Sequence, residues 1–149
     1  MKTRNPILGA LAGMAGGVAF GMLMGMMGML PMVAQLVGSH SSVIGFLVHM
    51  INSALIGGAF GTLLGSKVRT PAQGAGWGAG YGVIWWFLGT LLIMPIWLGM
   101  PAQLHVEGMK NAMPSLMGHV IYGIITGITF DRLSHRSVSR HVGVLSTAR

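Results

Sequence analysis

The first long segment of this sequence, residues 7–33, reads ILGALAGMAGGVAFGMLMGMMGMLPMV and contains no charged residue. A helix that crosses the hydrocarbon core of a bilayer needs about 20 mainly apolar residues. The segment is also far longer than the roughly 7–15 apolar residues at the centre of a secretory signal peptide. We therefore expect it to be a retained transmembrane helix.

Three more apolar segments of spanning length follow, and they extend over residues 43–64, 75–98 and 113–130. Only 7% of the residues are charged and 52% are hydrophobic, whereas a soluble domain carries about 25% charged residues. The sequence therefore predicts an all-α integral membrane protein. Its four transmembrane helices would form a single domain over residues 1–133, followed by a basic tail over residues 134–149.

The basic residues predict the orientation of the chain in the membrane. Of the nine lysines and arginines, only Lys110 falls in an outer connection on this model of the topology. The other eight lie at the termini and in the middle connection: Lys2, Arg4, Lys67, Arg69, Arg132, Arg136, Arg140 and Arg149. Cytoplasmic loops are enriched in lysine and arginine. We expect both termini to be cytoplasmic, in a bacterial inner membrane. The net charge of +7 would then meet acidic lipid rather than nucleic acid.

The two halves of the chain resemble each other. The second and fourth apolar segments align without gaps at an offset of 70, which places His49 on His119 and Phe60 on Phe130. The first and third align at an offset of 64, which places Pro31 on Pro95. The pattern predicts a tandem duplication of a two-helix unit, with repeat 1 at about 7–65 and repeat 2 at about 74–131. Both repeats would have the same topology.

Glycine recurs at four-residue spacing along the predicted helices. Residues four apart share one helix face, and small residues at that spacing let helix backbones approach closely in lipid. These rows would pack the helices inside one bundle, or dock a neighbouring subunit. The glycines expected to pack helices are Gly13, Gly17, Gly21, Gly25, Gly57, Gly61, Gly123 and Gly127.

The sequence offers little for catalysis by side chains. Its only acids are Glu107 and Asp131, and the predicted topology puts them on opposite sides of the membrane, so they cannot act as an acid/base pair. Cysteine is absent, which excludes thiolate nucleophiles and disulfides. We expect that the protein is not an enzyme.

His49 and His119 are the first candidates for binding a ligand. Ionisable residues within a membrane are costly and are often functional. The two histidines are equivalent under the repeat, so they could face each other and hold a b-type haem or a metal ion. Alternatively, each imidazole could hydrogen-bond between helices, because Ser53 and Ser115 lie four residues away on the same faces.

The 14 methionines suggest a second ligand set, because most of them fall in the predicted outer half of the protein. Thioether and imidazole without thiolate suit copper. The candidate copper ligands are Met22, Met26, Met29, His40 and His105. Alternatively, methionine simply fills gaps between glycine-packed helices.

Together these features favour a small polytopic membrane protein without catalytic activity. It would act as a structural or accessory subunit in a homo-oligomer or a larger membrane complex. One alternative is a membrane protein that holds haem b or copper through His49 and His119. A second is a small solute transporter or channel along the repeat axis, although the chain lacks the acids or arginines within the membrane that usually couple transport.

Overall fold

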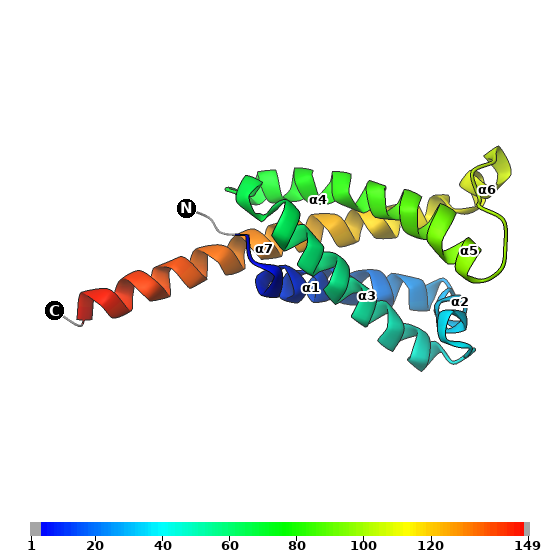
Figure 1. Cartoon of the computed structure of the whole chain (residues 1–149), viewed down its shortest axis with the longest axis horizontal. Coiled ribbons are helices and arrows are strands. Elements are labelled where there is room, and N and C mark those ends of the chain that lie inside the picture. Colours follow the sequence, from blue (N-terminus) through cyan, green and yellow to red (C-terminus); the bar gives the residue numbers. More distant parts are fainter. Residues whose placement is uncertain (1–3, 148–149) are drawn as a thin grey trace.

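The computed structural model of the chain describes the backbone of residues 4–147 and the side chains of residues 4–135, and it is all-helical over this range (Figure 1). The elements are α1 (Pro6–Met26), α2 (Leu30–Ala34), η1 (Gln35–Val37), α3 (Ser42–Leu63), η2 (Gly65–Lys67), α4 (Pro71–Trp85), η3 (Trp86–Ile93), α5 (Met94–Trp97), α6 (Val106–Asn111) and α7 (Met113–Thr147). Four helical segments are long and apolar enough to cross a membrane: Pro6–Met26, Ser42–Leu63, Pro71–Trp97 and Met113–His135. These spans agree with the four expected from the sequence and support a multi-pass membrane protein.

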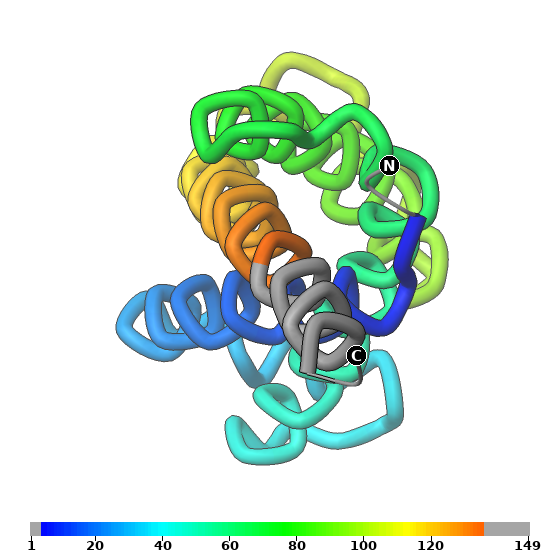
Figure 2. Tube along the Cα trace, turned by 90° about the vertical axis from the view of Figure 1, so that its left-hand side faces the viewer, coloured from blue at the N-terminus to red at the C-terminus, as the bar shows by residue number. Residues whose placement is uncertain are grey.

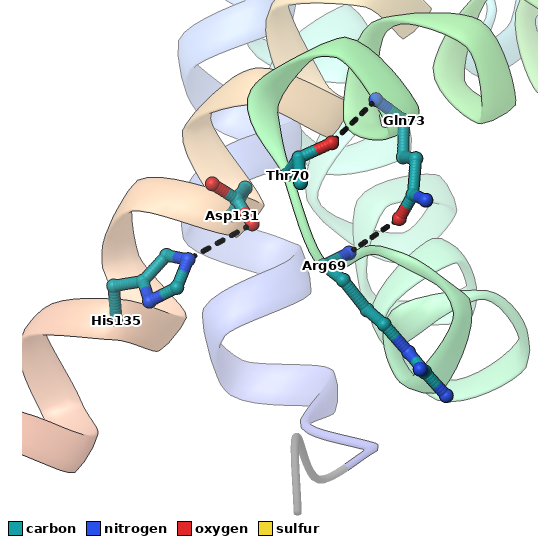
Figure 3. A network of polar contacts seen from close by, with 5 residues as sticks. All are labelled: Arg69, Thr70, Gln73, Asp131 and His135. Carbon is teal, nitrogen blue, oxygen red and sulfur yellow. Dashed lines mark hydrogen bonds and ion pairs between the residues drawn. The ribbon is translucent and has the colours of Figure 1, made fainter.

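The first and third spans begin with the same capping arrangement. The Asn5 side chain accepts a hydrogen bond from the Leu8 amide at 3.0 Å, and proline follows Asn5 at the first helical position. Thr70 accepts from the Gln73 amide at 3.2 Å, and Pro71 follows it. Such caps satisfy amides that have no partner within the helix, and proline at this position loses no hydrogen bond. Figure 3 shows the second cap beside Arg69, whose amide donates to the Gln73 side chain.

The helices pack in two close pairs, α1 with α3 and α4 with α7, and contact between α1 and α7 joins the pairs (Figure 2). The pairs approach through glycine. A Cβ atom added to Gly57 of α3 would lie 2.5 Å from the Cα of Gly13 in α1. One added to Gly123 of α7 would collide with the carbonyl of Gly78 in α4. Within each pair, backbone therefore packs directly on backbone.

The glycine row of α1 is used inside the chain. Gly9, Gly13, Gly17 and Gly21 are buried, and a Cβ at Gly17 or Gly21 would meet Ser53 or Phe46 of α3. Gly25, the last of the row, has more room, since its nearest neighbour would lie 3.6 Å away. The first four glycines of the row therefore pack against α3 within the chain.

Two spans are interrupted in the halves that lie near α2 and α5. The expected helix over residues 7–33 is broken after Met26, because Gly28 adopts a left-handed conformation (φ 68°). The chain then turns into α2, which packs on α3 where Gly45 leaves room for the Leu30 carbonyl. In the third span, residues 86–93 form a π-helix. Pro95 lies in the first turn of α5, and π-helical stretches are often found at functional sites.

The two ends of the bundle differ in chemistry. The start of α1, the end of α7 and the connection between α3 and α4 lie at one end, and α2, α5 and α6 lie at the other (Figure 1). At the first end the Asn5 amide donates to the Gly61 carbonyl, and Asp131, which is 1% exposed, pairs with His135 at 3.4 Å (Figure 3). The helix α7 continues to Thr147, so the predicted boundary at residue 134 falls within a helix. The side chains of the basic tail from residue 136 onward lie outside the described residues.

Candidate ligand-binding cavity

A cavity of about 490 Å³ lies between α3 and the third span, in the half of the bundle near α2 and α5. Residues of α1 and α7 also line it, so every span contributes to its wall. Most of the lining is apolar or aromatic, and it includes four methionines. The polar side chains that line it are His49, Asn52, Ser53, Thr90, Ser115 and His119, together with the hydroxyl-bearing Tyr122. The structure thus brings both predicted histidines to one site.

A backbone carbonyl of the neighbouring helix fixes His49. Its Nε2 donates to the carbonyl of Gly17 at 2.9 Å, which the imidazole can reach because α1 has no side chain there. Since a carbonyl oxygen only accepts, Nε2 carries the hydrogen. In the neutral ring Nδ1 is then an acceptor.

His119 is fixed through its other ring nitrogen. Its Nδ1 donates to the carbonyl of Ser115, one helical turn earlier, at 2.8 Å. The Ser115 hydroxyl lies 3.3 Å from the same nitrogen and 3.2 Å from the Thr90 hydroxyl of η3. In the neutral ring Nε2 of His119 is therefore the acceptor. Over residues 4–135 neither of these two acceptor nitrogens has a hydrogen-bond partner, so each histidine keeps one ring nitrogen with a free lone pair.

Phe20 separates the two imidazoles. The Phe20 ring packs edge-on against His49, with ring centroids 5.3 Å apart, and against His119, with centroids 4.8 Å apart. It reaches this position because Gly118 of α7 leaves room for it. The sequence predicted that the histidines would face each other, but it gave no sign of the intervening ring. A flat macrocycle held between both imidazoles would have to displace Phe20.

The candidate copper ligands do not gather at one place. Met22 and Met26 are exposed on the outer face of α1, at 64% and 85%. His40 and His105 are exposed in the two connections, and only Met29 lines the cavity. Over residues 4–135, no three His, Cys, Asp or Glu side chains come together as a metal site.

The methionines that do share the cavity with the histidines are Met24, Met29, Met32 and Met94. Only Met29 belongs to the candidate copper set. The two other candidate methionines, Met22 and Met26, do not line the cavity.

Asn52 is a further polar residue at the cavity, although the sequence favours a packing role for it. It lies within the span of α3, lines the cavity and is exposed. Its side chain makes no hydrogen bond with any described residue. Tyr122 of α7, by contrast, donates to the Ser53 carbonyl at 2.8 Å. An amide without a partner at this depth of an apolar segment is costly, and a ligand in the cavity could satisfy it.

The cavity exists because α3 and α4 do not pack as closely as the other neighbouring helices. At the α1–α7 contact, Gly16 lies so close to α7 that a Cβ would be 2.5 Å from the Tyr122 carbonyl. Between α4 and α3 a full side chain intervenes. The Tyr81 hydroxyl spans the gap and donates to the Ile56 carbonyl at 2.8 Å. The Tyr81 side chain therefore holds α3 and the third span apart along their line of contact, which we call the seam.

No protein-family model, curated protein or solved structure matches this chain. The function is accordingly argued from the cavity and its residues.

Proposed function

We propose that this chain is a small multi-pass membrane protein without catalytic activity that holds a ligand in the cavity between α3 and the third span. The observation that carries the proposal is the pair of histidines at one cavity. In each, a backbone carbonyl fixes one ring nitrogen and leaves the other as an acceptor. Pockets of this size, mostly apolar with a few convergent polar groups, are typical of ligand sites between the helices of a bundle. A role as accessory subunit of a larger membrane complex is compatible with this proposal.

A metal ion or haem remains the second candidate for the ligand. Histidines that bind metal commonly donate their other ring N–H to a backbone carbonyl, and His49 and His119 are held in this way. Two imidazoles with the thioethers of Met24 and Met29, which share the cavity, are a donor set that suits copper. Haem between the imidazoles requires Phe20 to rotate away.

The experiment is purification of the full chain in a mild detergent, followed by three measurements on the same sample. Absorbance detects haem, elemental analysis detects copper, and mass spectrometry of an organic extract detects other small molecules. We expect a stoichiometric ligand of one of these kinds, and its loss in His119→Ala. The control is Met22→Ala, because Met22 is exposed on α1 away from the cavity. A sample that contains no ligand and takes none up would refute the proposal.

We also propose that both termini are cytoplasmic, in a bacterial inner membrane. Arg4, Lys67, Arg69 and Arg132 support this orientation, because they lie on the segments that meet at one end of the bundle. The Lys67 ammonium lies over the Trp77 ring at 4.8 Å, and tryptophan is enriched at membrane interfaces. A protease site inserted between Ser39 and Ser42 should be cut from outside intact cells lacking an outer membrane. Cleavage only after lysis would refute the orientation.

The tandem duplication is also proposed, and the contacts favour a different register for the first helices. Gly9, Gly13 and Gly17 of α1 face α3 as Gly74, Gly78 and Gly82, each 65 residues later, face α7. The capped starts at Asn5 and Thr70 are also 65 apart. An offset of 65 rather than 64 therefore relates the first part of these spans. On α3 and α7 the partners follow the offset of 70: the Gly57 carbonyl faces Gly9, and the Gly127 carbonyl faces Gly74.

A further inference from the structure

We infer that the ligand is an alkyl-substituted phenol or hydroquinone dissolved in the bilayer, which reaches the cavity sideways from the hydrocarbon between α3 and the third span. The inference rests on the proposed function and names the chemical class of the ligand. Three features of the cavity carry it: where it opens, what its free polar atoms accept, and which rings line it.

The opening faces the apolar surface of the spans. The seam between α3 and the third span is tied at one end by the Tyr81–Ile56 hydrogen bond. At the other end the Trp97 indole donates to the carbonyl of Leu36 in η1, just before α3, at 3.1 Å. Between these ties, Leu55 of α3 and Ile93 of η3 line the cavity.

Leu55 and Ile93 are also exposed on the outside of the bundle, at 68% and 51%. Both belong to segments long and apolar enough to span the membrane. The gap between the two ties therefore opens on the apolar surface of the spans, where lipid tails would lie. A ligand that enters this way must be soluble in hydrocarbon, because the bilayer core holds essentially no water for polar groups.

The free polar atoms call for a hydrogen-bond donor on the ligand. The ring nitrogens not bonded to carbonyls, Nδ1 of His49 and Nε2 of His119, are acceptors in the neutral imidazoles. The Ser115 and Thr90 hydroxyls already bond each other, and the Ser53 hydroxyl lies 3.5 Å from Nε2 of His49. A hydroxyl can donate to an imidazole, whereas an ether or ester brings only acceptors. The Asn52 amide can bond either kind of group.

The lining favours an aromatic ring next to that hydroxyl. Phe20, Trp85, Trp97 and Tyr122 all contribute to the wall, and aromatic rings attract one another in edge-on and offset-stacked arrangements beyond the effect of the area they bury. An aliphatic substituent on the ring could pass between Leu55 and Ile93 into the lipid. A phenolic ring with an alkyl tail matches each of these features, and it leaves Phe20 in place between the histidines.

The test compares two probes that differ only in the donor. The full chain is reconstituted in phosphatidylcholine nanodiscs and titrated with 4-nonylphenol or with 4-nonylanisole, in which a methyl group replaces the hydroxyl proton. Tryptophan fluorescence reports binding, because Trp85 and Trp97 line the cavity, and native mass spectrometry gives the stoichiometry. We expect one saturable 4-nonylphenol per chain, bound roughly 3–10-fold more tightly than the anisole, as a single hydrogen bond would give.

The variant His119→Leu removes one of the two free ring acceptors, so it should reduce the preference for the phenol while leaving the anisole affinity unchanged, which also shows that the cavity is intact. The control Thr62→Val changes a hydroxyl on an exposed face of α3 and should keep the preference. If His119→Leu fails to fold, the ratio of the two probes' affinities for the unaltered chain still tests whether the ligand needs a hydrogen-bond donor.

The outcomes separate the inference from the proposed function. Equal binding of phenol and anisole by the unaltered chain would overturn the need for a donor, but it would leave a ligand-holding cavity. A stoichiometric haem or copper, with no saturable binding of either probe, would overturn the phenol and uphold ligand binding through the histidines. Absence of both metal and organic binding would overturn both.

Discussion

The contact between α4 and α7 allows a stringent test of the fold, through the pair of substitutions Gly78→Ala and Gly80→Ala. Both place one methyl group in the same helix, two residues apart. At Gly78 the new Cβ would collide with the Gly123 carbonyl and lie 2.6 Å from its carbon atom. At Gly80 it would meet no atom within 4 Å.

The difference between the two variants isolates the cost of the collision. Ordinary contacts of a Cβ begin near 3.4 Å, so Gly78→Ala forces the helices apart by roughly 1 Å or bends them, and overpacking of this kind costs typically 1–3 kcal/mol. Both variants gain the same preference of alanine over glycine for helix, up to about 1 kcal/mol. We expect Gly78→Ala to be less stable than Gly80→Ala by about 1–3 kcal/mol, and Gly80→Ala to be no less stable than the original chain.

The assay is reversible unfolding in mixed micelles of a mild detergent and sodium dodecyl sulfate, followed by tryptophan fluorescence. The free energy of unfolding is compared at one fixed detergent composition. Equal stability of the two variants would refute the direct backbone contact between α4 and α7. Greater stability of Gly78→Ala would refute it more strongly.

Three further substitutions test the ties and the break in the spans. Tyr81→Phe removes the hydrogen bond to the Ile56 carbonyl and should lower the free energy of unfolding by about 1 kcal/mol. The measurement uses the same micelles. An unchanged free energy of unfolding would argue against this hydrogen bond. Trp97→Phe loses the hydrogen bond to the Leu36 carbonyl. It should speed amide hydrogen exchange in residues 35–38, while exchange in α7 stays unchanged. Exchange in residues 35–38 at the rate of the original chain would contradict the Trp97–Leu36 hydrogen bond. Gly28→Ala should destabilise the chain by about 1–2 kcal/mol, because the left-handed conformation there (φ 68°) is unfavourable for alanine. The new methyl group itself would meet no atom within 4 Å. A melting temperature equal to that of the original chain would contradict the turn.

Hydropathy was sufficient to predict the four spans, because the length and apolar composition of a helix are set by the bilayer. The interruptions were not predictable in this way. Gly28 is one of many glycines in an apolar run, and only the backbone conformation distinguishes it. The π-helical segment from Trp86 to Ile93 has no composition that separates it from an ordinary transmembrane helix.

The site was predictable only in part, for a similar reason. The repeat brought attention to His49 and His119, and both line one cavity. Phe20, which lies between them, is an ordinary apolar residue in the sequence, and its place depends on the missing side chain at Gly118 of the facing helix. Contacts between helices determine which faces of α1 are buried. The number and spacing of methionines in the sequence therefore could not show that Met22 and Met26 face outward.

The division of the bundle into a glycine-packed half and a methionine-lined half has a mechanical consequence. At the contact between α4 and α7, around Gly74 and Gly78, no side chain lies between the two helices. No rotamers can therefore rearrange there, and the two helices form a rigid pair. Around the cavity the wall includes Met24 and Met29, whose unbranched side chains can change rotamer at little cost. Ligands of different shape can thus be accommodated by changes of side-chain rotamer around the cavity, while the glycine-packed half of the protein keeps its shape.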